Sequence, residues 1–154
     1  MEPFTTSAAA FVRKAFGDLL AVADRVGEPG IGERPVGEDT TAIANLVAHC
    51  CGVTEFWFGH VALGRPSDRD RDAEFTSRPS LADLHELVDA ATPRAEADLA
   101  ELGSRLAEHP REHEMRAFFP EGDTSDHALV LYVLRELYQH LGHAEITADV
   151  LTTR

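Results

Sequence analysis

Apolar residues recur at intervals of three and four in four long segments of the chain, and the stretches between these segments hold most of the glycine and proline. Such spacing places apolar side chains on one face of an α-helix, whereas the strict alternation typical of strands is almost absent. The pattern predicts helices over residues 6–26, 40–63, 80–107 and 126–151. We therefore expect an all-α protein, a four-helix bundle, formed by a single domain over residues 1–154.

Short-range signals mark the ends of these helices. Gly27 follows the first segment and Gly64 follows the second, each with a proline two residues later, which is a typical helix stop. Ser80 and Asp83 have the spacing of a capping box at the start of the third segment. Pro93 lies inside the third segment and should kink that helix.

Two connections between the predicted helices are long. Residues 66–80 contain the run Asp68-Arg69-Asp70-Arg71-Asp72, and this composition predicts a solvated linker. Residues 108–123 contain the sequence Phe118-Phe119-Pro120, for which we favour a satellite core cluster over a substrate lid. Long connections also release neighbouring helices from simple up-and-down order.

The charge balance excludes several classes of partner. The 154 residues carry 27 acidic and 14 basic side chains, a formal net charge of −13, and the basic residues are scattered, so we expect no nucleic-acid partner and no membrane partner. No apolar run approaches the roughly 20 residues that span a bilayer, and the N-terminus lacks the features of a secretory signal, so we expect a cytoplasmic protein. The adjacent Cys50 and Cys51 cannot readily form a disulfide with each other, which is consistent with a reducing compartment.

Four ionisable side chains share helix faces with apolar residues. In the fourth segment, steps of four and three place six residues on one helix face: Leu129, Val133, Glu136, His140, His143 and Thr147. In the second segment, one face carries Leu46, His49, Val53 and Phe56. A carboxylate and an imidazole one turn apart can converge on one cation, and His49 would complete a triangle with Glu136 and His140. Three protein ligands with open positions are typical of catalytic metal sites.

Other interpretations fit the same residues. A histidine on an apolar face is usually a hydrogen-bonded core residue, and Glu136 with His140 has the spacing of an ordinary surface ion pair near Arg135. Cys50 and Cys51 adjoin the candidate ligand in the sequence. Because successive helical positions point about 100° apart, at most one of them could approach that site, and buried inert thiols are favoured over nucleophiles or metal thiolates.

The remaining histidines are weaker candidates. His109 and His113 are four residues apart, but an intervening proline disfavours a shared helical face. His60 lies eleven residues after the candidate ligand in its own segment, roughly 16 Å along a helix axis and too far to share one ion. His85 and His127 are expected to be surface or packing residues. The absence of Glu-x-x-His and His-Glu-x-x-His motifs excludes the usual di-iron bundle and one class of metalloprotease.

Two blocks of the sequence resemble the signature regions of the DinB/YfiT-like superfamily. They are residues 45–53, Asn-Leu-Val-Ala-His-Cys-Cys-Gly-Val, and residues 136–144, Glu-Leu-Tyr-Gln-His-Leu-Gly-His-Ala. The similarity is greatest to the actinobacterial branch that includes the metal-binding domain of mycothiol-dependent maleylpyruvate isomerase. The aromatic residues 56–58, followed by Gly64, are also similar to that family's second helix. Helix number and order agree over nearly the whole chain, whereas the specific motifs occupy only the two short blocks.

The resemblance implies helices arranged up-down-down-up and a divalent metal, often zinc or nickel, held by three side chains. His49 matches the first family ligand, and Glu136 with His140 matches the Glu-x-x-x-His pair of the isomerase branch. Many members carry His-x-x-x-His on the last helix, but His143 comes only three residues after His140. Three roles therefore remain for His143: it could hydrogen-bond to a ligand, replace a ligand, or serve only as a packing residue. The resemblance also implies a low-molecular-weight thiol such as mycothiol.

The favoured function is that of a metal-dependent enzyme that joins a mycothiol-like thiol to an electrophilic substrate, because a cation lowers the pKa of a bound thiol. The same residues could instead activate water for hydrolysis. The sequence ends soon after the last predicted helix, so we expect no C-terminal domain like that of the isomerase relatives and do not favour ring isomerisation. The alternative class is a non-catalytic bundle that binds a small ligand or acts in stress responses. Bundles also form homodimers through exposed faces, but the pattern identifies no such face.

Overall fold

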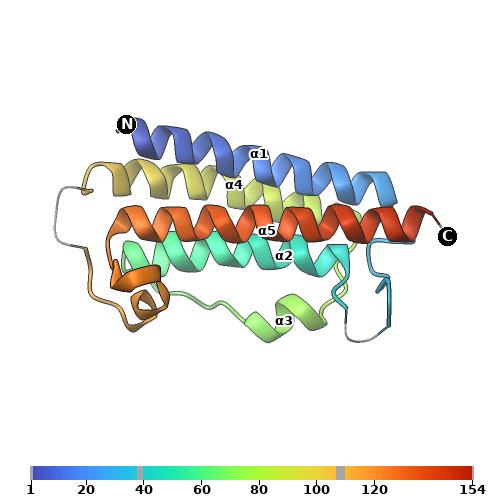
Figure 1. Cartoon of the computed structure of the whole chain (residues 1–154). Coiled ribbons are helices and arrows are strands. Elements are labelled where there is room, and N and C mark those ends of the chain that lie inside the picture. Colours follow the sequence, from blue (N-terminus) through green and yellow to red (C-terminus); the bar gives the residue numbers. More distant parts are fainter. Residues whose placement is uncertain (1, 38–39, 107–109, 154) are drawn as a thin grey trace.

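The computed structural model describes residues 2–37, 40–106 and 110–153 (Figure 1). Four long helices form its body: α1 (Pro3–Val26), α2 (Ile43–Thr54), α4 (Leu81–Gly103) and α5 (Asp126–Thr152). The shorter elements are the π-helical turns η1 (Glu55–Ala62), the helix α3 (Arg71–Thr76) and the 3-10 turns η2 (Glu114–Phe118) and η3 (Pro120–Gly122). The described residues contain no strand, and the predicted all-α bundle is confirmed.

The helices run in the order up-down-down-up. Figure 1 shows α1 and α5 running in one direction and α2 and α4 running in the other. Because α2 and α4 are parallel, the chain between them has to return along the bundle. Residues 64–80, which contain α3, make this return on the outer side of α2.

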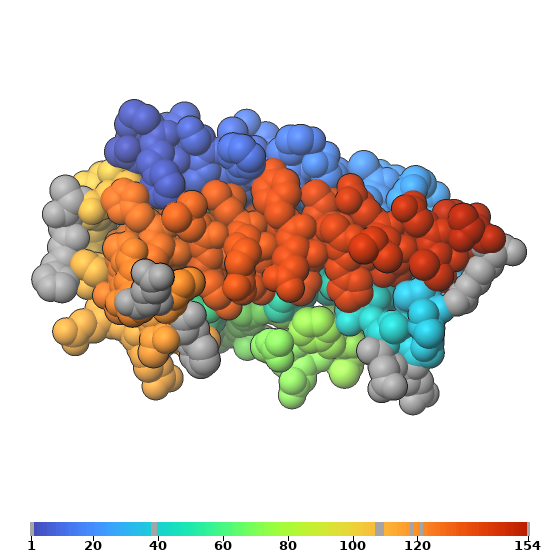
Figure 2. Space-filling view, viewed as in Figure 1, coloured from blue at the N-terminus to red at the C-terminus, as the bar shows by residue number. Residues whose placement is uncertain are grey.

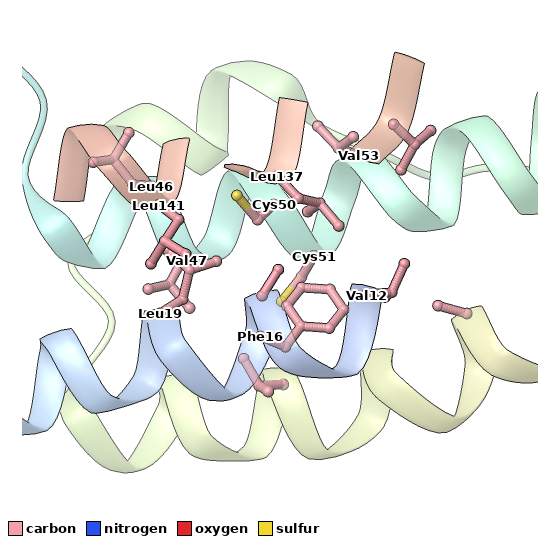
Figure 3. Packing of buried hydrophobic residues seen from close by; sticks show 14 of the residues in the cluster. Val12, Phe16, Leu19, Leu46, Val47, Cys50, Cys51, Val53, Leu137 and Leu141 are labelled. Atoms are coloured by element: carbon pink, nitrogen blue, oxygen red, sulfur yellow. The ribbon is translucent and has the colours of Figure 1, made fainter. Parts of the chain in front are cut away.

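The hydrophobic core lies between the long helices and consists of side chains that the apolar periodicity predicts. Figure 3 shows Phe16 and Leu19 of α1 packed with Val47, Leu137 and Leu141 from neighbouring helices. Four of these five side chains have no measurable solvent exposure, and each fully buried side chain of this size contributes about 1.5–3 kcal/mol to folding. The core contains two free cysteines and supports the fold without a disulfide.

Several helix boundaries differ from those predicted. The first helix begins at Pro3, where a proline in the first turn loses no hydrogen bond. The second begins at Ile43, and from residue 55 it widens into π-helical turns that end with the Leu63 amide donating to the Phe58 carbonyl at 3.1 Å. The third helix continues through Pro93 and ends at Gly103; residue 107, its predicted end, lies outside the described residues.

The prediction of a solvated linker for residues 66–80 is only partly right: most of these residues are exposed, but the segment is packed on the bundle. Part of this segment forms α3, which packs on α2. The Asn45 side chain of α2 donates to the backbone carbonyls of Glu74 and Ser77, at 2.9 Å each, and Glu74 is itself buried. The segment is charged, yet it is held against the bundle because it has to cross the outer face of α2 to reach the start of α4. Figure 2 shows α3, in green, below α5 on this face of the molecule.

The second long connection carries the predicted satellite cluster. Phe119 is buried and packs against Trp57 and Tyr132, with ring centroids 5.5 and 5.4 Å away, so the expectation is confirmed for this residue. The side chain of Phe118 lies outside the described residues. A buried ion pair between Arg116 and Asp126, with an N–O distance of 2.5 Å, fixes the connection to the start of α5.

Among the described residues, no helix has the length and apolar character needed to cross a membrane.

Candidate metal centre

Three side chains from two helices meet at the edge of the bundle core. One potential ligand atom from each of His49, Glu136 and His140 lies within 4.8 Å of the other two. The two imidazole rings are perpendicular, with centroids 4.7 Å apart, and the Nε2 atom of His140 is 3.6 Å from an oxygen of Glu136. Two ligand atoms of one tetrahedral zinc ion lie roughly 3.3–3.8 Å apart. The structure thus brings together the three residues that the sequence singled out, at nearly the spacing that one cation requires.

Helix packing explains why these side chains converge. His49 lies on the face of α2 that packs against α5, between the buried residues Leu46 and Val53. Glu136 and His140 each precede a buried leucine of α5, so they project from the edge of the core face, with side chains 17% and 19% exposed. The group is therefore shielded by the core on one side and accessible from the other.

Glu74 belongs to residues 64–80, the crossing segment, and its carboxylate contacts His49 on the side away from the other candidate ligands. The Nδ1 atom of His49 is 2.8 Å from Oε2 of Glu74. An ionised carboxylate can only accept, so Nδ1 carries a proton, and in the neutral ring the lone pair available to a metal is on Nε2. Arg69 donates to both oxygens of Glu74, at 2.6 and 2.8 Å. Burial alone would raise the pKa of Glu74, but the hydrogen bonds from Arg69 and His49 outweigh it and hold this pKa below its usual value.

The absence of a side chain at Gly52 makes room for this carboxylate. A Cβ atom on Gly52 would lie 2.0 Å from Oε1 of Glu74, which is a severe overlap. Asn45, His49 and Gly52 follow one another at steps of four and three, so they form a single stripe on α2 that the crossing segment covers. Sequence reasoning missed Glu74 and its arginine partner. The signal that could have indicated a close neighbour is a glycine inside a helix, one turn after the candidate ligand.

The state of His140 suits a metal ligand. Burial lowers its pKa, and the neighbouring His49 lowers it further, so the neutral imidazole with a free lone pair is favoured. Its Nδ1 atom is buried and has no hydrogen-bond partner among the described residues. An unsatisfied buried nitrogen is costly. Two neutral imidazoles and a carboxylate form a donor set that fits zinc or nickel. Glu136 is partly buried and already pairs with Arg135, whereas the unpaired nitrogen of His140 would gain a partner in a bound ion.

A cavity of about 470 Å³ opens onto the three side chains. Its walls are aromatic, basic and aliphatic, and are formed by Val53, Phe56, Trp57, His60, Ser67, Arg69, Arg71, Phe75, Met115 and Tyr132 in addition to the three candidate ligands. His60 lies outside the ligand group, as expected, but it lines this cavity, and its Nδ1 atom donates to the Arg65 carbonyl at 2.7 Å. The space is large enough for a small-molecule substrate beside the candidate ligands.

The other histidines lie away from the ligand group. His143 is exposed on α5 and is not part of the group. His85 lies 2.8 Å from a carboxylate oxygen of Asp24, and His127 packs near Phe4, as surface or packing residues would. His113 packs against His60, with ring centroids 5.3 Å apart. His109 lies outside the described residues.

Both cysteines are buried, and neither belongs to the ligand group. Figure 3 shows Cys50 and Cys51 among the packed core side chains. Burial raises the pKa of Cys50 far above its usual range, and burial together with the negative charge of Glu74 raises the pKa of Cys51 to about 12. Thiolates are therefore scarce at neutral pH, and the prediction of inert thiols agrees with the structure.

Comparison with known proteins identifies the family. A sequence model described as mycothiol-S-transferase matches residues 8–152. The chain belongs to the mycothiol-S-transferase family. No curated protein and no solved structure shows a significant match. Membership of the mycothiol-S-transferase family confirms the predicted resemblance to a mycothiol-related, DinB-like group, and it points to a mycothiol-related enzyme rather than a bundle of unrelated function.

Proposed function

We propose that this member of the mycothiol-S-transferase family is a metal-dependent enzyme that transfers a mycothiol-like thiol to an electrophilic substrate. In this proposal His49, Glu136 and His140 hold a divalent cation, either zinc or nickel. The observation that carries the proposal is the approach of three ligand atoms to within 4.8 Å of one another beside a cavity. The family match supports the choice of a thiol as the substrate.

The proposed chemistry divides between the cation and the protein. A bound dication supplies the Lewis acidity that lowers the pKa of a small thiol and favours its nucleophilic form at neutral pH. Glu74 holds the imidazole of His49 in one orientation and one tautomer. Trp57, Phe56 and Phe75 form apolar walls of the cavity and limit the access of water to the reacting groups.

The nucleophile in this proposal comes from the substrate and not from the protein. Cys50 and Cys51 are buried, with pKa values raised by burial, and they do not line the cavity beside the ligand group. Cys50 is enclosed in the core and Cys51 borders a different cavity, so neither thiol can meet a substrate at the candidate ligands without a rearrangement. The external thiol therefore has to supply the sulfur, which agrees with the substrate that the family name gives.

Metal content is the first test. Protein purified without chelator and without nickel resin should contain about one equivalent of divalent metal. The His49→Ala variant should lose most of it, while His85→Ala, which changes an imidazole outside the cavity, should retain it. Substoichiometric metal that His49→Ala does not alter would favour the alternative, a non-catalytic bundle that binds a small ligand.

Thiol consumption is the second test. Mycothiol should disappear in the presence of a panel of electrophiles at a rate that depends on the enzyme, and removal of the metal should abolish that rate. Release of hydrolysed electrophile with no loss of thiol would instead indicate that the site activates water. Glu136→Gln should lower the rate together with metal content, since it removes the anionic ligand.

A further inference from the structure

The charge-alternating run 68–72, which lies within the described part of the chain, contributes its arginines, but none of its aspartates, to the cavity beside the candidate ligands. Asp70 has extended backbone angles, φ −102° and ψ 95°, and successive side chains of an extended segment point to opposite sides. Arg69 and Arg71 line the cavity beside the candidate ligands, and within the described ranges none of the three aspartates of the run does so. Asp70 lines another pocket, next to α4, which Arg69 also borders, whereas Arg71 lines only the cavity beside the candidate ligands of these two. The crossing segment therefore turns its positive charges towards the cavity.

The two arginines differ in what balances their charge. Arg69 is fully engaged by Glu74. The guanidinium of Arg71 lies over the ring of Phe75, with Cζ 5.3 Å from the centroid, and makes no ion pair or hydrogen bond within the described part of the chain. The ring of Phe75 also packs against the ring of His49, with centroids 4.9 Å apart. One aromatic ring thus contacts both an uncompensated cation and a candidate metal ligand.

The ionisable groups of the cavity favour an anion. Glu136 is the one carboxylate among the described lining residues, in a chain whose formal net charge is −13. A dication at the ligand group would make the cavity positive overall. The charge of a thiolate would be balanced at that cation, and the charge of Arg71 is then left for the second substrate.

We infer that Arg71 binds a carboxylate carried by the electrophilic acceptor, and that the enzyme selects carboxylate-bearing electrophiles. This inference rests on the proposed function. A guanidinium binds a carboxylate through two parallel hydrogen bonds, and stacking on Phe75 holds its plane in place. The side chain of Arg71 is exposed, so the interaction weakens as salt concentration rises.

Two chloroacetamides test this selection. One carries an N-ethyl group and the other an N-(2-carboxyethyl) group, so the reacting carbon is the same and only the remote charge differs. With mycothiol, the thiolate sulfur forms a bond to the chloromethyl carbon, the carbon–chlorine bond breaks, and chloride leaves with the electron pair. The proton of the thiol passes to the buffer.

The wild-type enzyme should prefer the carboxylate-bearing acceptor by at least about tenfold in kcat/KM, the scale of a charge-assisted hydrogen bond. Arg71→Gln should remove most of this preference, and added salt should reduce it in the wild type. Arg78→Gln is the matched control, because Arg78 lies in the same segment but outside this cavity. An equal preference in Arg71→Gln, or no preference in the wild type, would overturn the assignment.

A binding measurement separates this inference from the proposed function. The unreactive acid 3-acetamidopropanoate and the neutral N-ethylacetamide can be titrated into isotope-labelled protein, metal-free and zinc-loaded, with Kd followed by NMR. The acid should bind at least about tenfold more weakly to Arg71→Gln than to the wild type or to Arg78→Gln. If neither chloroacetamide consumes thiol, the proposed function fails, and this titration still decides the role of Arg71. Equal affinities of the wild type and Arg71→Gln for the acid would overturn the assignment of Arg71 as a carboxylate-binding residue.

Discussion

The Nδ1 atom of His49 and the Oε2 atom of Glu74 are joined at 2.8 Å, although α3 and α2 are separate elements and the two residues are 25 positions apart. The hydrogen bond fixes which nitrogen of His49 faces the cavity. It also ties a candidate ligand to the segment that connects α2 with α4. The ligand group is therefore organised by three parts of the chain, and two of these are the helices that supply the ligands.

Glu74→Gln should weaken metal binding without removing a ligand. A glutamine amide cannot hold His49 as a carboxylate does and cannot form the ion pair with Arg69, so the ring loses its fixed orientation. We expect a fall of about 10- to 100-fold in metal affinity, the usual effect of removing such a partner. Competition with a chromophoric chelator measures this. Glu86→Gln, an exposed change on α4, should leave the affinity unaltered; equal affinities in both variants would show that Glu74 has no role in metal binding.

Gly52→Ala should destabilise the protein and displace the crossing segment. The added Cβ would lie 2.0 Å from Glu74 Oε1 and 3.0 Å from Arg69 Nε, so the ion pair has to move. The expected loss is about 1–3 kcal/mol of unfolding free energy, typical of overpacking, measured by urea denaturation. Gly17→Ala, in α1, has no atom within 4 Å of the new Cβ and should instead stabilise the protein by about 0.5–1 kcal/mol. A neutral or stabilising Gly52→Ala would contradict the packing described for this stripe.

The part of this arrangement that depends on helix periodicity could be predicted from the sequence. The spacing of Glu136 and His140 places them one turn apart on any α-helix, and the apolar neighbours of His49 turn it towards a packed face. These are local properties, so they hold before the helices are assembled. The long helices and the three candidate ligands were therefore within reach of pattern analysis.

The contribution of Glu74 depends on the path of the chain in three dimensions. A six-residue helix in a charged segment has no apolar period that would distinguish it from solvated linker, and its position follows from the parallel arrangement of α2 and α4. The π-helical turns at residues 55–62 are a second example. Their aromatic residues fit an α-helical pattern equally well, and the wider turn is settled by packing against other elements.

Cys50 and Cys51 should react very slowly with a disulfide reagent in the folded protein. Their exposed fractions are 0% and 7%, and the pKa of Cys51 is raised to about 12. At pH 9 only roughly a thousandth of such a group is ionised, compared with most of an unperturbed cysteine. Thiol release followed by absorbance at pH 7 and pH 9 should be slow in buffer and complete within minutes in urea. Rapid labelling of native protein would show that the core opens, and Cys51→Ala would identify which thiol reacted.

Asp98 should make stability fall as pH rises, in contrast to most aspartates of a folded protein. One of its oxygens pairs with Arg65, but the other is buried without a hydrogen-bond partner in the described residues, and burial outweighs the arginine to raise the pKa of Asp98. A carboxyl whose folded pKa exceeds its unfolded value contributes stability at low pH. That contribution is lost as pH rises from about 4 through the folded pKa.

The unfolding free energy of the wild type relative to Asp98→Asn should therefore decrease between pH 4 and pH 7, as measured by urea denaturation at several pH values. Asp83→Asn provides a control of opposite sign. Hydrogen bonds from Ser80 lower the pKa of Asp83, so its contribution is present above the unfolded pKa and is lost as pH falls through the folded pKa. If both differences changed with pH in the same direction, burial would not be the dominant influence on Asp98, and its pairing with Arg65 would have to outweigh the unsatisfied oxygen.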